Sequence, residues 1–488
     1  MSGKSQRLFA VFDIGTTGTR SVLVDEEGRE IGKAYEEYPT APRELGIHEQ
    51  LTETYWRTSS VTMQRALAKA NQSQEDVVAV IATTTRDCLT LVDKDVNPLA
   101  PTVTWQDNRT TEKAEELAEE LGPRRSIKRL LWFQQERPEI FEKAAKFIYL
   151  DAYINYRLCG ALVSDPSNAR FGPVDHKTLR WSEELCDVTG IPIDKLATIE
   201  SPGVMIGEVS GESSKATGLR KGTPVIMGSG DQQCSALGTG TIENGRVKAT
   251  TGTGTFVITQ TDEFIEDSYI MFSNPAAIPG RWILEGVIPG TGMAYKWYRD
   301  NFYSAMSVAA VSANENIYGI MESSAAEVPA GSDGLVVFPF MPYNKGIIYN
   351  LGFDHSRAHL ARAIMEANGY GIQMYIEMME GTLDIEFEEI VIDGGAANST
   401  LWRQIQADCT NKTVAVPEVK DSTVIGAAIL GTVGSGIYST YEEAVSNMVS
   451  IEERRQPIPE HVRIYKERYE VFNKLLIAEM AHLVGESS

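Results

Sequence analysis

The feature that most constrains the fold is a strand–turn–strand pattern that occurs twice. Residues 11–28, VFDIGTTGTRSVLVDEEG, combine an apolar strand, a tight Gly/Thr turn and a returning strand, and residues 247–260, VKATTGTGTFVITQ, repeat the pattern. Such an internal duplication is the signature of two related halves. A chain of 488 residues is also too long for one core. We therefore expect two domains, residues 1–244 and 245–488, with a cleft between the two turns.

The first turn has the residue types of a phosphate-binding loop. Gly15 allows close backbone approach, so that amide N–H groups point inward, and Thr16 and Thr17 add hydroxyl donors. Asp13, at the end of the strand, would direct a carboxylate toward a metal ion on the phosphate, and Arg20 would supply a charge-assisted contact. An ordinary glycine hairpin is the alternative, and the residues alone leave both interpretations open.

Composition argues against several classes of function. The 45 basic and 67 acidic residues leave a formal charge of −22, which opposes binding to nucleic acid or to an anionic membrane. Five cysteines without a C-x-x-C pair indicate neither a disulfide framework nor a zinc ribbon. The start, MSGKSQRLF, has no apolar signal core, so we expect a cytoplasmic protein. The small-apolar run 423–438 is too short to span a bilayer comfortably and predicts a buried helix.

The secondary-structure pattern is that of a mixed α/β protein. The β-branched runs 8–14, 20–25 and 77–82 predict strands, and the stretches 110–121 and 137–158 predict helices. Strands followed by helices in this way indicate a sheet covered by helices.

A candidate base lies between the two repeated patterns. The segment PVIMGSGDQQCSALGTG places Asp231 after an apolar strand. Phosphoryl transfer to an alcohol needs a carboxylate that accepts the hydroxyl proton, and Asp231 is our candidate; a helix cap is an equally good interpretation. Further on, EEIVIDGGAANSTLWRQIQAD ends a strand at Asp393 and enters a helix whose N-terminus suits a ligand group. Asn398 is a helix cap, which the sequence favours, or a contact to a nucleotide base.

A second polar cluster follows the strand VVAVIATTT. Arg86 and Asp87 come directly after it, where ligands of α/β sheets gather, and an adjacent Arg and Asp suit the hydroxyl groups of a polyol. Trp105 in TVTWQDNRT offers a flat face to carbon-bound hydrogens. Without further context, a surface ion pair and a core tryptophan are the simpler interpretations.

Five segments, FDIGTTGTR, GDQQ, TTGTGTF, DGGAANSTLWRQIQAD and DSTVIGAAILG, resemble the FGGY family of carbohydrate kinases in order and approximate spacing. The resemblance covers nearly the whole chain, and five motifs in register argue against coincidence. It implies an α/β fold of two ribonuclease-H-like domains, of the actin and hexokinase type, around an ATP cleft. It also implies ATP and Mg²⁺ as cofactors, a small sugar or polyol as substrate, and a homodimer as the expected assembly.

Carried over by position, the resemblance assigns three groups of site residues. The metal-associated carboxylates would be Asp13 and Asp231, and Asp231 would also be the catalytic base. The nucleotide and its phosphates would contact Gly15, Thr16, Thr17, Arg20, Gly252, Thr253, Gly254, Gly292, Lys296, Gly394, Gly395, Ala396 and Asn398. The substrate would contact Arg86, Asp87, Trp105, Asp107, Asp231, Gln232 and Phe256.

The departures from glycerol kinases lie mainly at the substrate end. Asp87 stands where these kinases have Glu, and their substrate tyrosine, expected just before SIKRLLW, has no counterpart. Lys296 replaces a Gln near the nucleotide. The W-x-D-x-R pattern of Trp105, Asp107 and Arg109 resembles xylulokinases, and Asp107 would meet a ketose hydroxyl.

Other segments resemble kinases of a quorum-sensing autoinducer, namely DPSNA, RLLWF and IPGRWILEGVIPGTGMAYKWYRD. We therefore place a linear ketose such as xylulose slightly ahead of the autoinducer, and both ahead of glycerol. The rival from another class is a non-catalytic, nucleotide-switched module, because the same fold serves filaments and chaperones. The polyol-type pair of Arg86 and Asp87, together with Asp231, argues for the enzyme.

Overall fold

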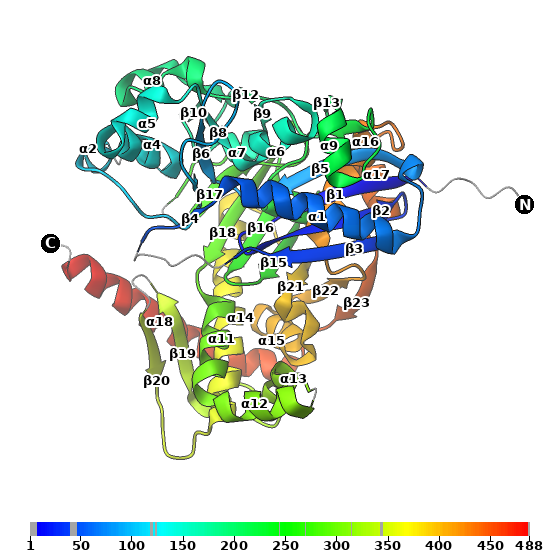
Figure 1. The fold of residues 1–488 in the computed structure, drawn as a ribbon. Helices are drawn as coiled ribbons and strands as arrows, with labels where there is room; N and C mark the ends of the chain where they lie inside the picture. The colour runs from blue at the N-terminus through cyan, green and yellow to red at the C-terminus, as the bar shows by residue number, and fades with distance from the viewer. Residues whose placement is uncertain are drawn as a thin grey trace, which may run out of the picture.

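Two β-sheets with corresponding strand order form the framework of the molecule (Figure 1). The structure is a computed structural model and describes residues 7–39, 46–117, 121–122, 124–243, 245–268, 270–313, 315–341 and 345–486. The first sheet runs in the order β13 (Met205–Glu208), β14 (Pro224–Ile226), β5 (Val77–Thr84), β1 (Leu8–Ile14), β2 (Gly18–Asp25) and β3 (Glu30–Glu37). The second runs in the order β17 (Met271–Pro275), β18 (Trp282–Ile288), β16 (Thr255–Thr261), β15 (Arg246–Thr251), β21 (Glu389–Gly394), β22 (Thr413–Pro417) and β23 (Ile451–Arg455).

The two sheets repeat the same pairing. In each, an antiparallel hairpin, β1–β2 or β15–β16, carries the Gly/Thr turn. A parallel strand, β5 or β21, pairs with the first strand of the hairpin, and β14 or β22 extends the sheet in the same direction. An antiparallel edge strand closes each sheet. The predicted duplication is therefore present at the level of topology.

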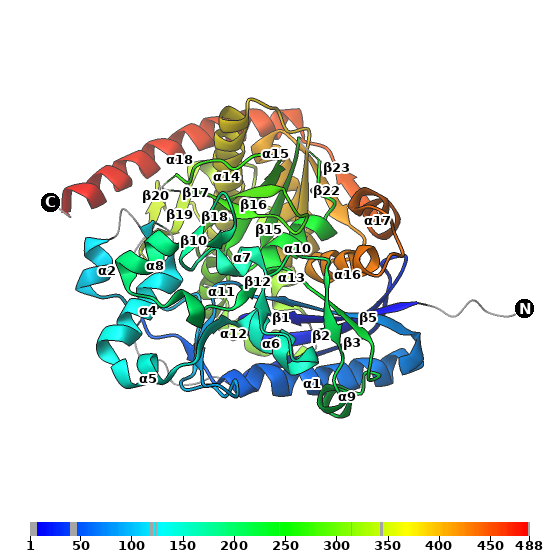
Figure 2. The same cartoon turned by 90° about the horizontal axis from the view of Figure 1, so that it is seen from above.

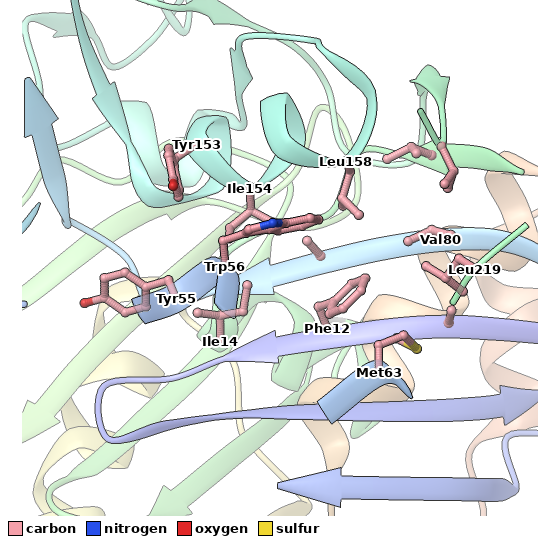
Figure 3. Packing of buried hydrophobic residues seen from close by; sticks show 14 of the residues in the cluster. Phe12, Ile14, Tyr55, Trp56, Met63, Val80, Tyr153, Ile154, Leu158 and Leu219 are labelled. Carbon is pink, nitrogen blue, oxygen red and sulfur yellow. The ribbon is translucent and has the colours of Figure 1, made fainter. Parts of the chain in front are cut away.

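Helices cover both faces of the first sheet. Its central strand β1 is therefore buried almost throughout. One face packs against α1 (Thr52–Ala70) and α6 (Leu150–Cys159), where Phe12, Trp56 and Ile154 meet (Figure 3). The other face is covered by α10 (Asp231–Gly238), α16 (Ser422–Gly434) and α17 (Tyr441–Met448). Figures 1 and 2 both show α16, in orange, beside the blue strands of the N-terminal half.

A smaller α/β unit extends from the first sheet. Its sheet has the order β4 (Glu49–Gln50), β7 (Thr102–Val103), β6 (Leu89–Val92) and β8 (Lys146–Tyr149). Around it lie the helices α2 (Glu112–Glu116), α4 (Arg125–Glu136), α5 (Pro138–Lys143) and α8 (Glu183–Thr189). Shorter elements of this half are α7 (Pro166–Ala169), α9 (Gly211–Thr217), β9 (Val163–Ser164), β10 (Val174–Asp175), β11 (Arg180–Trp181) and β12 (Thr198–Ile199).

Two helix predictions need correction in this unit. The stretch 137–158 is not one helix, because β8 separates α5 from α6. Phe147, Ile148 and Tyr149 pair with β6 and are buried, so tertiary packing overrides the local pattern. The stretch 110–121 contains α2 at 112–116, and part of it lies outside the described residues.

The second half adds mainly helices. They are α11 (Thr291–Phe302), α12 (Ser304–Ala313), α13 (Ile317–Ala326), α14 (Arg357–Leu383), α15 (Thr400–Thr410) and α18 (Pro459–Glu486), with the hairpin β19 (Val336–Met341) and β20 (Lys345–Tyr349). The long helix α14 packs on the second sheet through Ile372 and Ile376. The predicted buried helix at 423–438 is α16, whose residues from Val424 to Thr432 are all buried. Among the described residues, no helix combines the length and the apolar character that crossing a membrane requires.

Candidate active site

The turn between β1 and β2 lines an open cavity of about 360 Å³. The amide of Gly15 donates to the carbonyl of Gly18 at 3.0 Å, which closes the turn. Burial raises the pKa of Asp13 to about 6, an effect that nearby Arg20 opposes and the Asp231 carboxylate reinforces. The cavity is lined by Asp13, Gly15, Thr17, Gly18, Arg20, Lys33, Tyr35 and Asp421. An amide-rich turn beside a carboxylate and two cations suits a phosphate with its metal ion.

The second turn gathers the predicted nucleotide segments. Gly252 donates its amide to the carbonyl of Gly254 at 2.8 Å, so this turn too is closed by a hydrogen bond between two glycines, over one residue fewer than the first turn. The amide of Met293 donates to Thr253 at 3.2 Å, so the N-terminus of α11 lies against this turn. A Cβ at Gly292 would stand 1.9 Å from the Gly252 carbonyl oxygen. Only glycine fits at this contact. The close approach directs the backbone N–H groups at the start of α11 toward the turn.

The strand β21 brings the remaining nucleotide candidates to the same turn. Gly394 has a positive φ of 80°, and a Cβ there would stand 2.6 Å from the Thr251 carbonyl oxygen. The short 3₁₀ helix η5 (Gly395–Asn398) follows, with Ala396 buried and Asn398 exposed. Lys296 is exposed on α11. The favoured helix-cap interpretation of Asn398 is wrong, because the Ser399 hydroxyl caps α15 by accepting from the Trp402 amide at 3.1 Å.

Asp231 is the first residue of α10 and lies at the seam between the sheets. Its Oδ1 accepts from the Gln232 amide at 2.8 Å and stands 3.7 Å from Arg86 Nε. Burial raises the pKa of Asp231, and Arg86 counteracts part of that effect. Arg86 Nη2 donates to Glu285 Oε1 at 2.9 Å, across from the second sheet. A carboxylate, a guanidinium and a second carboxylate thus meet where the two halves touch.

Several buried polar atoms around this seam have no protein partner among the described residues. They are Arg86 Nη1, Gln232 Oε1 and both amide atoms of Gln233. Unpartnered buried polar atoms are costly, so a polar ligand or a water molecule bound there would complete their hydrogen bonding. Phe256, on β16, packs against a small hydrophobic cluster that contains Ala236 of α10.

Arg86 and Asp87 point to different partners. Asp87 has a positive φ of 58° and is fully buried. Its Oδ1 accepts from Ser126 Oγ at 2.6 Å and from Arg129 Nη1 at 2.8 Å, and its Oδ2 lies 3.2 Å from Arg125 Nε. A strained backbone at a buried, ligated carboxylate is a feature of functional sites.

Arg129 organises the other predicted substrate residues. Its Nη2 donates to the carbonyl oxygens of Trp105 at 3.1 Å and Asp107 at 3.4 Å. The Trp105 indole Nε1 donates to Thr16 Oγ1 at 2.9 Å, which links this cluster to the phosphate turn. Asp107 is bidentate to Arg109, at 2.8 Å and 2.7 Å. The Asp107 carboxylate is therefore already engaged within the protein.

Three further residues were missed by sequence reasoning. Asp421, before α16, pairs with both Arg20 and Lys33, and these cations lower its pKa although burial alone would raise it. Glu285 lies inside the apolar strand WILEGVI. A lone carboxylate in such a strand is unusual and could have marked Glu285 as a candidate site residue. Arg129 lies within the apolar face of α4, where a buried cation is equally unusual. Asp421 is the first residue of the segment DSTVIGAAILG, but its pairing could not be predicted because its partners are about 400 residues away in sequence.

Two domains of one family match the chain in order: the N-terminal domain of the FGGY family of carbohydrate kinases over residues 8–238, and the C-terminal domain of that family over residues 247–435. The chain belongs to this family. It is 30% identical to the autoinducer-2 kinase of Yersinia enterocolitica over 487 residues, which cover 93% of this chain and 91% of that protein. It is 28% identical to the gluconokinase of Bacillus subtilis, covering 95% and 94% of the two chains.

The fold agrees with solved structures of this kind. The crystal structure of xylulose kinase from Rhodospirillum rubrum superimposes with a TM-score of 0.85 at 23% identity, covering 98% of this chain and 99% of that chain. The predicted α/β fold of two ribonuclease-H-like domains is confirmed. The protein is a phosphotransferase that uses a carbohydrate acceptor, and the non-catalytic alternative is set aside. Membership of this kinase family implies the use of ATP.

Proposed function

We propose that this kinase transfers the γ-phosphoryl group of MgATP to a primary hydroxyl of a small neutral sugar or polyol. The observation that carries the proposal is the group of unpartnered buried atoms of Arg86, Gln232 and Gln233 beside the Asp231 carboxylate. These atoms offer both donors and acceptors, as a polyhydroxylated ligand requires. We place a linear ketose such as xylulose first, and the autoinducer and glycerol after it.

Charge favours a neutral substrate over a sugar acid. The Arg86 guanidinium already faces two carboxylates, Asp231 at 3.7 Å and Glu285 at 2.9 Å. A substrate carboxylate would add a third negative charge to this buried group, which is costly. The similarity to a gluconokinase therefore carries less weight for the substrate than the similarity to the autoinducer-2 kinases.

The roles of the chain's own residues follow from their places. Asp231 accepts the proton of the attacking hydroxyl, because its carboxylate lies at the start of α10 beside Arg86, which would bind the acceptor. Asp13, with Asp231, would hold Mg²⁺; among the described residues no group of three or more side chains is arranged as a metal site, and Mg²⁺ bound to ATP needs only one or two carboxylates. The turns at 15–18 and 252–254 donate amides to the phosphates, and Arg20 neutralises charge.

The remaining assignments extend this site. Trp105, which lies beside Thr16, would pack its flat face against the carbon-bound hydrogens of the substrate. Asp87, Asp107 and Phe256 stay predicted substrate contacts. Because Arg109 holds both oxygens of Asp107, a substrate hydroxyl at Asp107 would share that carboxylate with Arg109.

The test is release of ADP, measured by a coupled assay with MgATP across D-xylulose, L-xylulose, D-ribulose, L-ribulose, glycerol, erythritol, gluconate and the autoinducer precursor. We expect one neutral compound to raise ADP release far above the basal rate. Strong turnover with gluconate alone would overturn the neutral-substrate proposal. Turnover of the autoinducer precursor alone would make the second candidate the substrate.

A further inference from the structure

We infer that Glu285 is a positioning residue that orients Arg86 for the substrate from the opposite domain. The inference rests on the proposed function, because it assumes that Arg86 binds the acceptor. Arg86 follows β5 of the first sheet, and Glu285 lies in β18 of the second, 199 residues away in sequence.

The pair is close and buried. Arg86 Nη2 donates to Glu285 Oε1 at 2.9 Å and lies 2.9 Å from Oε2, and the two side chains are 9% and 7% exposed. The stem of Arg86 packs on the backbone of Gly230, where a Cβ would meet its Cγ at 2.6 Å. With its stem held by the first domain and one nitrogen held by the second, the planar guanidinium has little freedom to rotate.

The orientation leaves one specific donor for a ligand. Nε faces Asp231 at 3.7 Å, Nη2 is used by Glu285, and Nη1 is buried without a protein partner among the described residues. Nη1 is therefore the donor that remains for a substrate oxygen. If Glu285 is lost, the guanidinium is free to turn toward Asp231, which would both misdirect Nη1 and occupy the base.

The same contact couples the two halves to the acceptor. Arg86 reaches its binding orientation only when β18 lies against the first domain. A ligand that uses Nη1 therefore stabilises this arrangement of the two domains, and the arrangement in turn strengthens binding of the ligand.

A second interdomain ion pair provides a comparison. Arg170 Nη2 lies 2.8 Å and 2.6 Å from the two oxygens of Asp267; within the described residues neither side chain hydrogen-bonds to Arg86 or Asp231, although the charges of Arg86 and Glu285 act on Arg170.

The experiment compares Glu285→Gln and the charge-conserving, shorter Glu285→Asp with the control Asp267→Asn in the full-length enzyme, using the best acceptor found for the wild type. We expect kcat/KM for the acceptor to fall about 10- to 100-fold in both Glu285 variants, the range for a lost charge-assisted hydrogen bond. KM for MgATP should stay within about twofold of wild type, and Asp267→Asn should keep its kcat/KM for the acceptor.

The double variant with Arg86→Gln separates positioning from general stability. If Glu285 acts through Arg86, the double variant has the same kcat/KM as Arg86→Gln alone, whereas independent effects would multiply. Multiplied effects, or Glu285 variants that behave like Asp267→Asn, would overturn the inference and leave the proposed function intact. Absence of acceptor-stimulated ADP release in the wild type would instead overturn the proposed function, and the inference with it.

Discussion

The buried carboxylate of Asp13, in the candidate phosphate site, lowers the stability of the ligand-free protein. Its carboxylate is held near the Asp231 and Asp421 carboxylates, and burial raises its pKa to about 6 from 3.8. The unfolded chain therefore loses this proton more easily than the folded chain. Between these two pKa values the folded state binds more protons than the unfolded state. The free energy of unfolding therefore falls as the pH rises through this range. A bound cation would relieve this cost.

We therefore expect Asp13→Asn to stabilise the protein at pH 7.5 in the absence of Mg²⁺ and nucleotide. The gain should be roughly 1–3 kcal/mol, because a pKa shift of one unit corresponds to about 1.4 kcal/mol. It should vanish by about pH 3, where the carboxyl group is largely protonated in both states. Denaturant unfolding at several pH values measures it, with the exposed Asp95→Asn as control. Destabilisation of Asp13→Asn at pH 7.5 would contradict this account.

At the scale of elements, the base depends on one close helix contact. A Cβ at Gly426 of α16 would stand 1.8 Å from the carbonyl oxygen of Cys234 in α10, and one at Gly238 would stand 1.9 Å from that of Ser422. The two helices therefore meet backbone to backbone, and α10 begins with Asp231. Lys248 also anchors α10, since its buried Nζ donates to Ser235.

Gly426→Ala should force these helices apart. We expect a loss of about 1–3 kcal/mol in unfolding free energy, as for overpacked cores, together with a lower kcat. The matched variant is Gly381→Ala, at an exposed helical glycine with nothing within 4 Å of the added Cβ. It should stabilise the protein by about 0.5–1 kcal/mol. Equal effects of the two substitutions, measured by denaturant unfolding, would refute the role of the close contact.

The elements also show what the sequence can and cannot predict. The strands β1, β2 and β5 and the buried helix α16 follow from local apolar patterns, and the repeated Gly/Thr turns lie where the pattern places them. The strand β8 was missed because its pairing with β6 comes from residues more than fifty positions earlier. The partners of Arg86 and Arg20 were missed for the same reason, because Glu285 and Asp421 meet them only through the folded topology.

At the scale of the molecule, the two sheets are separate, but the core of the first sheet includes residues of the second half. We propose residue 244 as the boundary between the sheets. Nevertheless, Phe9 and Val22 of the first sheet pack in one cluster with Val424 and Ala444, far beyond that boundary. The C-terminal half therefore completes the core of the N-terminal half (Figure 2).

This shared core predicts cooperative unfolding. We expect calorimetry of the ligand-free protein to show one transition, because loss of α16 exposes an apolar face of the first sheet. Two well-separated transitions would contradict the prediction, and so would a fragment of residues 1–244 that unfolds with the same midpoint as the whole chain.

The central claim is that Asp231 accepts the proton of the acceptor hydroxyl, and the most direct measurement is the turnover of Asp231→Asn. With the best acceptor and saturating MgATP, we predict that kcat falls by about 100-fold or more, as for loss of a general base. Binding of ATP without Mg²⁺, measured by calorimetry, should change little, because Asp231 is assigned to the metal and the acceptor and not to the nucleotide, and the exposed Asp95→Asn should keep full turnover. Near-normal kcat in Asp231→Asn would contradict the account.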